Sequence, residues 1–193
     1  NTISTDEDVT YNFTGNEFLY GDVDGDALAA LKVEAVPGNG ALSYDGTNLV
    51  AGDTVPGGSL DLLTYNPDLN FSGNDSLSFR VYDGQEYSAQ AYTLEFIVGG
   101  DNDAPTATND SGSGFSTDED TAFTTASVLA NDTDPDTGDV LSVQSIDTTG
   151  TLGTVTDNGD GTFGYDPNGQ FEHLGVGETA TDSFSYTVAD GNG

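Results

Sequence analysis

The chain lacks cysteine and tryptophan and has almost no basic side chains. Its 193 residues include 34 acidic side chains but only two basic ones, Lys32 and Arg80, giving a formal net charge of −32. Nucleic acids and anionic membranes attract clustered Lys and Arg, so binding to nucleic acid is excluded. Without cysteine there are no disulfides or thiolate zinc sites. No apolar run reaches the ~18–20 residues of a membrane-spanning helix, so membrane insertion is not expected.

The remaining composition favours a folded protein over an acidic disordered chain. High net charge with low hydrophobicity is typical of disorder, but here 34% of the residues are hydrophobic and 10% are aromatic. The acidic residues are 26 Asp and only 8 Glu, and there are 26 Gly. Asp and Gly are typical of turns, and Asp also of metal-binding loops. We therefore expect an all-β fold that needs a counter-charge.

The sequence repeats itself at domain scale. Three landmarks occur twice in the same order: residues 4–8 and 116–120, 22–26 and 132–139, and 75–84 and 182–191. Their spacing indicates two copies of a unit of roughly 100 residues, a common domain size. We predict domains at residues 1–100 and 101–193, with a Pro-bearing linker at 99–105.

Each copy alternates apolar and polar residues with a period of two. Leu77, Phe79 and Val81 do so in the first copy, and Phe184 and Tyr186 continue the pattern in the second. Such alternation predicts half-buried strands, and the segment 157–161 predicts a hairpin turn more readily than a metal loop. The segment 27–36 is also expected to be a strand. Two β-sandwiches in tandem account for these patterns.

The two copies differ at their ends. The first continues past Asp83-Gly84 into the alternating strand 92–98, whereas the second has no counterpart of that strand after Asp190-Gly191. We therefore expect the second sandwich to lack its last strand, as a fragment or an interrupted repeat would. An unpaired edge strand attracts other strands, so completion by another chain is an alternative.

Short motifs along the whole chain resemble bacterial cadherin-like repeats of large surface or secreted proteins. The first copy resembles the tandem cadherin-like type through residues 49–55, 65–67, 70–73 and 101–105. The second resembles a VCBS-type repeat through residues 128–134, 158–163, 171–174 and 177–179. The resemblance implies Ig/cadherin-like sandwiches, an extracellular or cell-surface location and a role in adhesion or biofilms.

Alternating strand directions place acidic groups at the ends of the sandwiches. The group expected at the junction between the domains is Glu7, Asp75, Asp101, Asn102, Asp103, Asp132, Asp134, Asp136, Asp139 and Asp190. A second group, at the other end of the first domain, is Asp22, Asp24, Asp26 and Asp83. Carboxylates this close raise one another's pKa unless a cation neutralises them. Ca²⁺ is the expected cofactor, since it takes 6–8 oxygen ligands in flexible geometry, whereas Mg²⁺ needs rigid octahedral sites.

The family resemblance supports the same metal. Cadherins bind Ca²⁺ between domains through an Asp-x-Asn-Asp linker, a Glu before a strand and an Asp-x-Asp loop. The likeness carries this role to Glu7, residues 101–103, Asp134 and Asp136. This linker lacks the second Asn of the cadherin form, which leaves the number of ions open, and any single Asp-x-Asp can instead be a plain turn.

The expected function is a calcium-stabilised extender segment of a large exported adhesin, which presents distal binding domains. Its partners would be neighbouring repeats of the same chain. The alternative is a calcium-dependent module of a surface protein or carbohydrate-active enzyme that binds polysaccharide or a cell-surface protein. Catalysis is not expected, because the sequence has no nucleophile elbow, phosphate loop or zinc pattern and only one histidine, His173.

Overall fold

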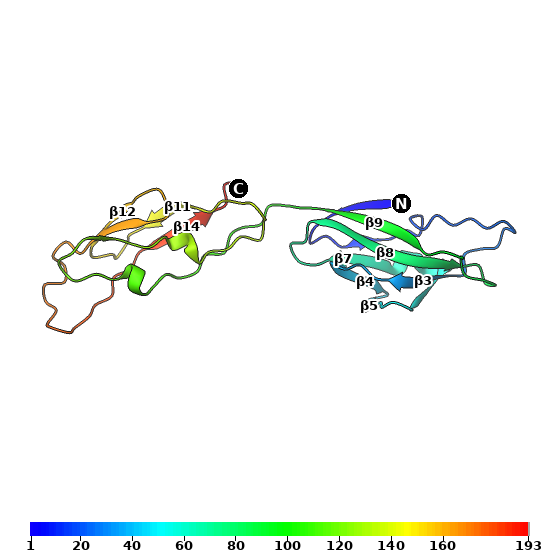
Figure 1. Cartoon of the computed structure of the whole chain (residues 1–193), viewed down its shortest axis with the longest axis horizontal. Coiled ribbons are helices and arrows are strands. Elements are labelled where there is room, and N and C mark those ends of the chain that lie inside the picture. The colour runs from blue at the N-terminus through cyan, green and yellow to red at the C-terminus, as the bar shows by residue number, and fades with distance from the viewer. Residues whose placement is uncertain (193) are drawn as a thin grey trace. The chain divides into compact units, whose positions relative to one another are not determined.

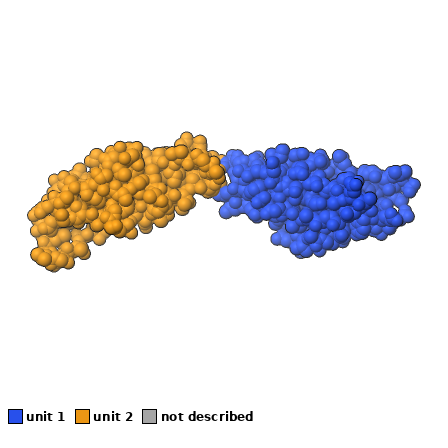
Figure 2. All heavy atoms as spheres, in the orientation of Figure 1, with its two compact units in different colours: residues 1–101 blue, residues 102–193 orange. Residues whose placement is uncertain are grey.

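A computed structural model describes residues 1–192 of the chain. The chain divides into two compact units, Asn1–Asp101 and Asn102–Gly193, called unit 1 and unit 2 below. Figure 2 colours the two units separately. The division lies one residue beyond the boundary expected from the repeats. The all-β prediction is confirmed, since every regular element is a strand or a short 3₁₀ turn in the part of the chain described.

Unit 1 is a sandwich of two sheets (Figure 1). One sheet has the order β1 (Thr2–Asp6), β9 (Tyr92–Gly99), β8 (Gly73–Tyr82), β3 (Ala30–Ala35) and β6 (Thr54–Pro56). Strand β1 runs parallel to β9, and the other neighbours are antiparallel. The second sheet has the order β2 (Tyr11–Asn12), β7 (Leu63–Pro67), β4 (Gly40–Tyr44) and β5 (Thr47–Asn48). The 3₁₀ segment η1 (Gly57–Leu62) links β6 to β7.

The core of unit 1 lies between its two sheets. Alternate residues of β8 and β9 point inward, so Leu77, Leu94 and Phe96 are almost completely buried. Tyr65 on β7 faces them from the other sheet and stacks on Phe96, with ring centroids 4.0 Å apart. The two-residue period of the sequence thus places one apolar face of each strand against the opposite sheet.

Unit 2 has fewer strands. One sheet has the order β10 (Phe123–Thr124), β13 (Phe163–Asp166) and β12 (Thr154–Asp157), and the other pairs β11 (Ser142–Asp147) with β14 (Ser185–Ala189). Two 3₁₀ turns, η2 (Ser113–Phe115) and η3 (Val128–Ala130), flank β10. The predicted hairpin at 157–161 is confirmed, since Asp157 pairs with Phe163 across it.

The same tyrosine–aspartate pair occurs in both units. In unit 1 the Tyr65 hydroxyl donates to Asp75 (3.0 Å), and the N–H groups of Gly38 and Asn39 also donate to this carboxylate (2.8 and 2.9 Å). Asp75 is buried, so these bonds satisfy a charge that water does not reach. The aspartate therefore fastens β8 to the segment before β4.

In unit 2 the equivalent aspartate is Asp182. It accepts hydrogen bonds from the Tyr165 hydroxyl (2.7 Å) and from the N–H groups of Leu152 (3.0 Å) and Gly153 (2.8 Å). Burial alone would raise the pKa of Asp182, but the bonds from Gly153, Tyr165, Leu152 and Ser183 outweigh it and lower this pKa below its usual range.

The sequence pattern favours a strand over residues 9–14 and a turn over residues 70–75 before the strand at 77–81, and the structure differs from both. Strand β8 begins at Gly73, so Asp75 lies inside a strand and not in the turn before it. The expected strand over residues 9–14 is reduced to Tyr11 and Asn12 in β2. A turn at Glu7 and Asp8, in which Asp8 adopts a positive φ of 57°, precedes this segment.

Candidate metal centre

Three aspartates of unit 2 come together in the loop between η3 and β11. Each of Asp134, Asp136 and Asp139 offers a carboxylate oxygen that lies within 4.8 Å of the others. The Asp136 N–H donates to the Asp134 carboxylate (2.8 Å), which closes a tight turn around Pro135. Gly138 then turns the chain back with a φ of 107°, a conformation that glycine adopts easily. This short loop therefore points three carboxylates toward one place.

One oxygen in this group stands out by its surroundings. The Oδ2 atom of Asp134 is buried and accepts no hydrogen bond from any described residue. A buried carboxylate oxygen without a donor is costly, and neighbouring carboxylates add repulsion. A bound cation would remove both penalties. The donor set consists only of oxygen atoms, which suits a hard divalent ion.

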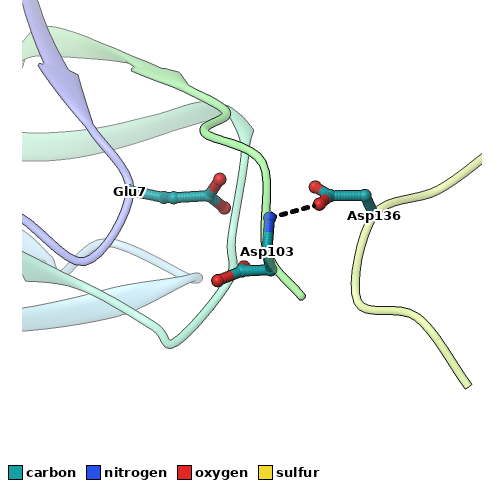
Figure 3. Close-up of side chains that lie close together, drawn as sticks. All are labelled: Glu7, Asp103 and Asp136. Atoms are coloured by element: carbon teal, nitrogen blue, oxygen red, sulfur yellow. Dashed lines mark hydrogen bonds between the residues drawn. The ribbon is translucent and has the colours of Figure 1, made fainter. Parts of the chain in front are cut away.

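The start of unit 2 is fastened to the same loop. The Asp103 N–H donates to the Asp136 carboxylate (2.7 Å), as Figure 3 shows. The Asn102 side chain donates to Asp190 (2.9 Å), which directly follows β14 and is buried. Both predicted linker residues thus contact predicted ligands of unit 2.

Asn192 also joins this group, although the sequence reasoning passed over it. Its side chain donates to Asp139 (2.7 Å), and its backbone N–H donates to Asp190 (2.7 Å). The loop before β11 and the end of β14 are therefore held together by one amide. The sequence signal that could have identified Asn192 is its position two residues after the predicted ligand Asp190.

Asp132 has a different environment from its neighbours in sequence. It accepts a hydrogen bond from the Thr108 N–H (2.7 Å), and its other oxygen lies 3.3 Å from the Tyr186 hydroxyl. Burial, and then the hydrogen bond to Asp110, raise the pKa of Tyr186 well above its usual range. Asp132 thus helps to hold the first segment of unit 2 against β14 and is not grouped with Asp134, Asp136 and Asp139.

In unit 1, Glu7 and Asp101 lie where β1 and β9 end. Glu7 is buried, and its carboxylate accepts a short hydrogen bond from the Asp101 N–H. Figure 3 also labels Glu7, on the turn that follows β1. The expected junction ligand Asp75 is instead engaged by Tyr65 and by the backbone before β4. Its role in the structure is to fasten strands.

The second predicted group, at the other end of unit 1, forms hydrogen-bonded turns. Asp22 accepts from the N–H groups of Asp24 and Asp26 (2.8 and 3.2 Å). Asp83 accepts hydrogen bonds from the N–H groups of Gln85 and Glu86, and these bonds lower its pKa. Gln85 bridges the two turns by donating to Asp26 (2.8 Å). Within residues 1–192 these acids form no group of three close enough to share an ion.

Two family models match the chain. The model for the bacterial cadherin-like domain matches residues 102–193, and the model for the bacterial Ig domain matches residues 1–94. Searches among curated proteins and among solved structures found no match. The resemblance to bacterial cadherin-like tandem repeats is confirmed, with an Ig domain model rather than a cadherin-like one matching the first copy.

Both kinds of domain are typical modules of bacterial surface proteins and are typically structural rather than enzymatic. Among residues 1–192, no helix is long and apolar enough to cross a bilayer. The chain is thus similar to a bacterial Ig domain over residues 1–94 and to a bacterial cadherin-like domain over residues 102–193, consistent with a tandem of cadherin-like repeats.

Proposed function

We propose that this chain is a calcium-stiffened spacer of an exported bacterial surface protein, with no enzymatic role. The observation that carries the proposal is the group Asp134, Asp136 and Asp139, in which a buried carboxylate oxygen has no hydrogen-bond donor. The match of unit 2 to bacterial cadherin-like domains supports the same metal.

Calcium fits this loop better than other common ions. Unit 2 contains 17 acidic residues and neither Lys nor Arg, so no permanently positive side chain of its own can neutralise the group. Ca²⁺ accepts carboxylate oxygens in flexible geometry, and the three aspartates of this loop supply them. Zinc would favour Cys and His ligands, which this loop does not contain.

Ion binding at this loop would order the linker. Asn102 and Asp103 are attached to Asp190 and Asp136, and Glu7 holds the backbone of Asp101 on the preceding side. We propose Asp103, whose N–H donates to Asp136, as a further ligand, and Glu7 and Asp101 as ligands from the likeness to cadherin-like domains alone. Without an ion, repulsion among the carboxylates would loosen residues 101–103.

This coupling would suit a spacer that works outside the cell. Extracellular calcium modules bind with dissociation constants of ~10⁻⁴–10⁻³ M, so such sites fill only where calcium is abundant. The chain would leave the cell as a loose acidic polymer and become stiff on arrival. Neighbouring domains of the same long chain would be its partners, holding a distal binding domain away from the surface.

Thermal unfolding with and without calcium tests the metal. At 100 times the dissociation constant, calcium should stabilise unit 2 by ~2.7 kcal/mol relative to the protein in EDTA. Asp134→Asn should remove most of this gain. Glu172→Gln is the matched control, because Glu172 is exposed and makes no hydrogen bond in the described structure. Equal melting temperatures of the wild type in both buffers would overturn the proposal.

Stiffening needs a separate measurement. NMR relaxation reports how independently the two units tumble, and calcium should make their tumbling more alike. Asp103→Ala should reduce this effect while both units stay folded. Tumbling that calcium leaves unchanged would contradict a spacer role even if the ion binds.

A further inference from the structure

The four-stranded sheet of unit 1 differs from the rest of the chain in its charge. None of the residues in β2, β7, β4 and β5 is acidic or basic. The five-stranded sheet of the same unit, by contrast, carries charged side chains that include Glu34, Arg80 and Glu95. In a chain with 34 acidic residues, a whole sheet without charge is a surface with its own chemistry.

The outer face of this sheet carries a row of polar side chains. Alternate residues of β4 and β7, such as Leu42, are buried, so Ser43 and Thr64 lie on the outer face. Thr64 is opposite Asn12 on β2 and opposite Ser43 on β4. Ser43 is in turn opposite Asn48 on β5. One row of amide and hydroxyl groups thus crosses the sheet, three of whose strands are labelled in Figure 1.

Hydrogen bonds within the face orient two of its amides. The Ser43 hydroxyl donates to the side-chain oxygen of Asn48 (2.7 Å). The Thr10 hydroxyl donates to the side-chain oxygen of Asn66 in the same way (2.7 Å). Both asparagines are exposed, and within residues 1–192 their amide nitrogens donate to no other residue. Their N–H groups are therefore held in place and available to a ligand.

The spacing along the row suits a polymer of sugars. Neighbouring strands lie about 4.7–4.9 Å apart, close to the length of one sugar residue in an extended β-linked polysaccharide. Asn, Ser and Thr side chains both donate and accept hydrogen bonds, as sugar hydroxyl groups do. A polysaccharide that lies across the four strands therefore meets one polar side chain for each of its sugar residues.

The charges around the face select an uncharged ligand. Asp45 lies in the turn between β4 and β5, and Asp68 directly follows β7. Both are exposed, so they would repel a polyanion that approaches the face. The same repulsion disfavours a second copy of this chain, whose formal net charge is −32. A neutral polysaccharide avoids both penalties.

We propose that the outer face of β2, β7, β4 and β5 binds an extended, uncharged polysaccharide. The sugar chain lies across the strands, and its hydroxyl groups form hydrogen bonds with Asn12, Thr64 and Asn48. Because no carboxylate belongs to the face, binding needs no calcium. This activity is separate from the spacer role and does not depend on it.

Neutral and anionic hexasaccharides test the proposal on the 193-residue chain. The neutral probes are β-1,4-linked hexasaccharides of glucose, xylose and mannose. The anionic control is hexamannuronate, which differs from the mannose probe by a carboxylate on each sugar. NMR titration should shift the side-chain amide signals of Asn12, Asn48 and Asn66 with at least one neutral probe, equally in EDTA and in calcium. Equal binding of hexamannuronate, a requirement for calcium, or no binding of any neutral probe would overturn the proposal.

Two matched variants locate the binding face. Thr64→Val keeps the shape of the side chain but removes its hydroxyl group, so binding of the neutral probe should weaken about fivefold. Thr93→Val makes the same change at an exposed position of β9, in the other sheet, and should leave binding unchanged. Equal weakening by both variants, or by neither, would contradict binding at this face.

Discussion

The two units share repeated sequence segments but differ in how many hydrophobic side chains they bury. Among the described residues, unit 1 packs 15 buried hydrophobic side chains into one cluster, whereas unit 2 buries only Val128, Phe163 and Phe171. The units also differ in their sheets: those of unit 1 have five and four strands, whereas those described in unit 2 have three and two. Strand β9 brings three of the fifteen buried side chains between the sheets of unit 1. The larger core thus accompanies the larger number of paired strands.

The largest expected effect comes from removing a buried side chain of β9. Phe96→Ala should destabilise unit 1 by ~3–5 kcal/mol, because it empties a fully buried position next to Tyr65. Phe184→Ala, at a partly exposed position in unit 2, should cost only ~1 kcal/mol. Urea unfolding followed by the NMR signals of each unit separates the two losses. Similar losses in both units would show that their cores are equally complete.

The next effect concerns the tyrosine–aspartate pair. Asp75→Ala should cost ~3 kcal/mol, since it leaves Gly38, Asn39 and Tyr65 with unsatisfied donors in a buried place. Asp182→Ala should cost ~1–2 kcal/mol, because water reaches this less buried site and satisfies part of the donors. Chemical denaturation of each variant measures both values. A larger loss of stability for Asp182→Ala than for Asp75→Ala would show that Asp182 is the more buried of the two aspartates.

Alanine substitutions at Gly40 in unit 1 and at Gly153 in unit 2 should destabilise their units by similar amounts. A Cβ atom on Gly40 would lie 2.6 Å from the Tyr65 ring, and one on Gly153 would lie 2.6 Å from the Tyr165 hydroxyl. Alanine at either position should therefore cost ~1–3 kcal/mol by overpacking. Gly159→Ala tests strain of a different kind, since this residue has open space but a φ of 78°. Thermal melts of the three variants compare them, and a harmless Gly153→Ala would show that Tyr165 is loosely held.

The smallest effect is the pH dependence that Asp182 gives to the stability of unit 2. The pKa of Asp182 is lowered in the folded protein, so it lies below the unfolded value of ~3.9. The unfolded state then binds the proton more readily, and the stabilisation is present above pH ~4 and is lost as the pH falls through the folded pKa. Asp182→Asn should flatten the acid limb of unit 2's stability curve, as circular dichroism would record. An acid limb of unchanged slope would assign the dependence to other carboxylates.

The sequence predicted the architecture well because local patterns carry it. Alternation at Leu77, Phe79 and Val81 located β8, and the Asn158-Gly159 turn located the β12–β13 hairpin. These features depend on neighbours within a few residues, which a sequence displays directly.

The choice among the acidic residues was decided by tertiary structure. Asp75 and Asp132 resemble the other predicted ligands in sequence, yet the fold pairs them with Tyr65 and Tyr186. Only the packing of distant strands determines which carboxylate meets a hydroxyl and which meets another carboxylate.

By itself, the sequence determined an acidic, cysteine-free, all-β tandem repeat with clustered aspartates. The tertiary structure decided that Asp134, Asp136 and Asp139 converge and that Asn192 ties Asp139 to Asp190. The physical reason is that composition and periodicity fix local conformation, whereas the distance between two charges depends on how the whole chain folds.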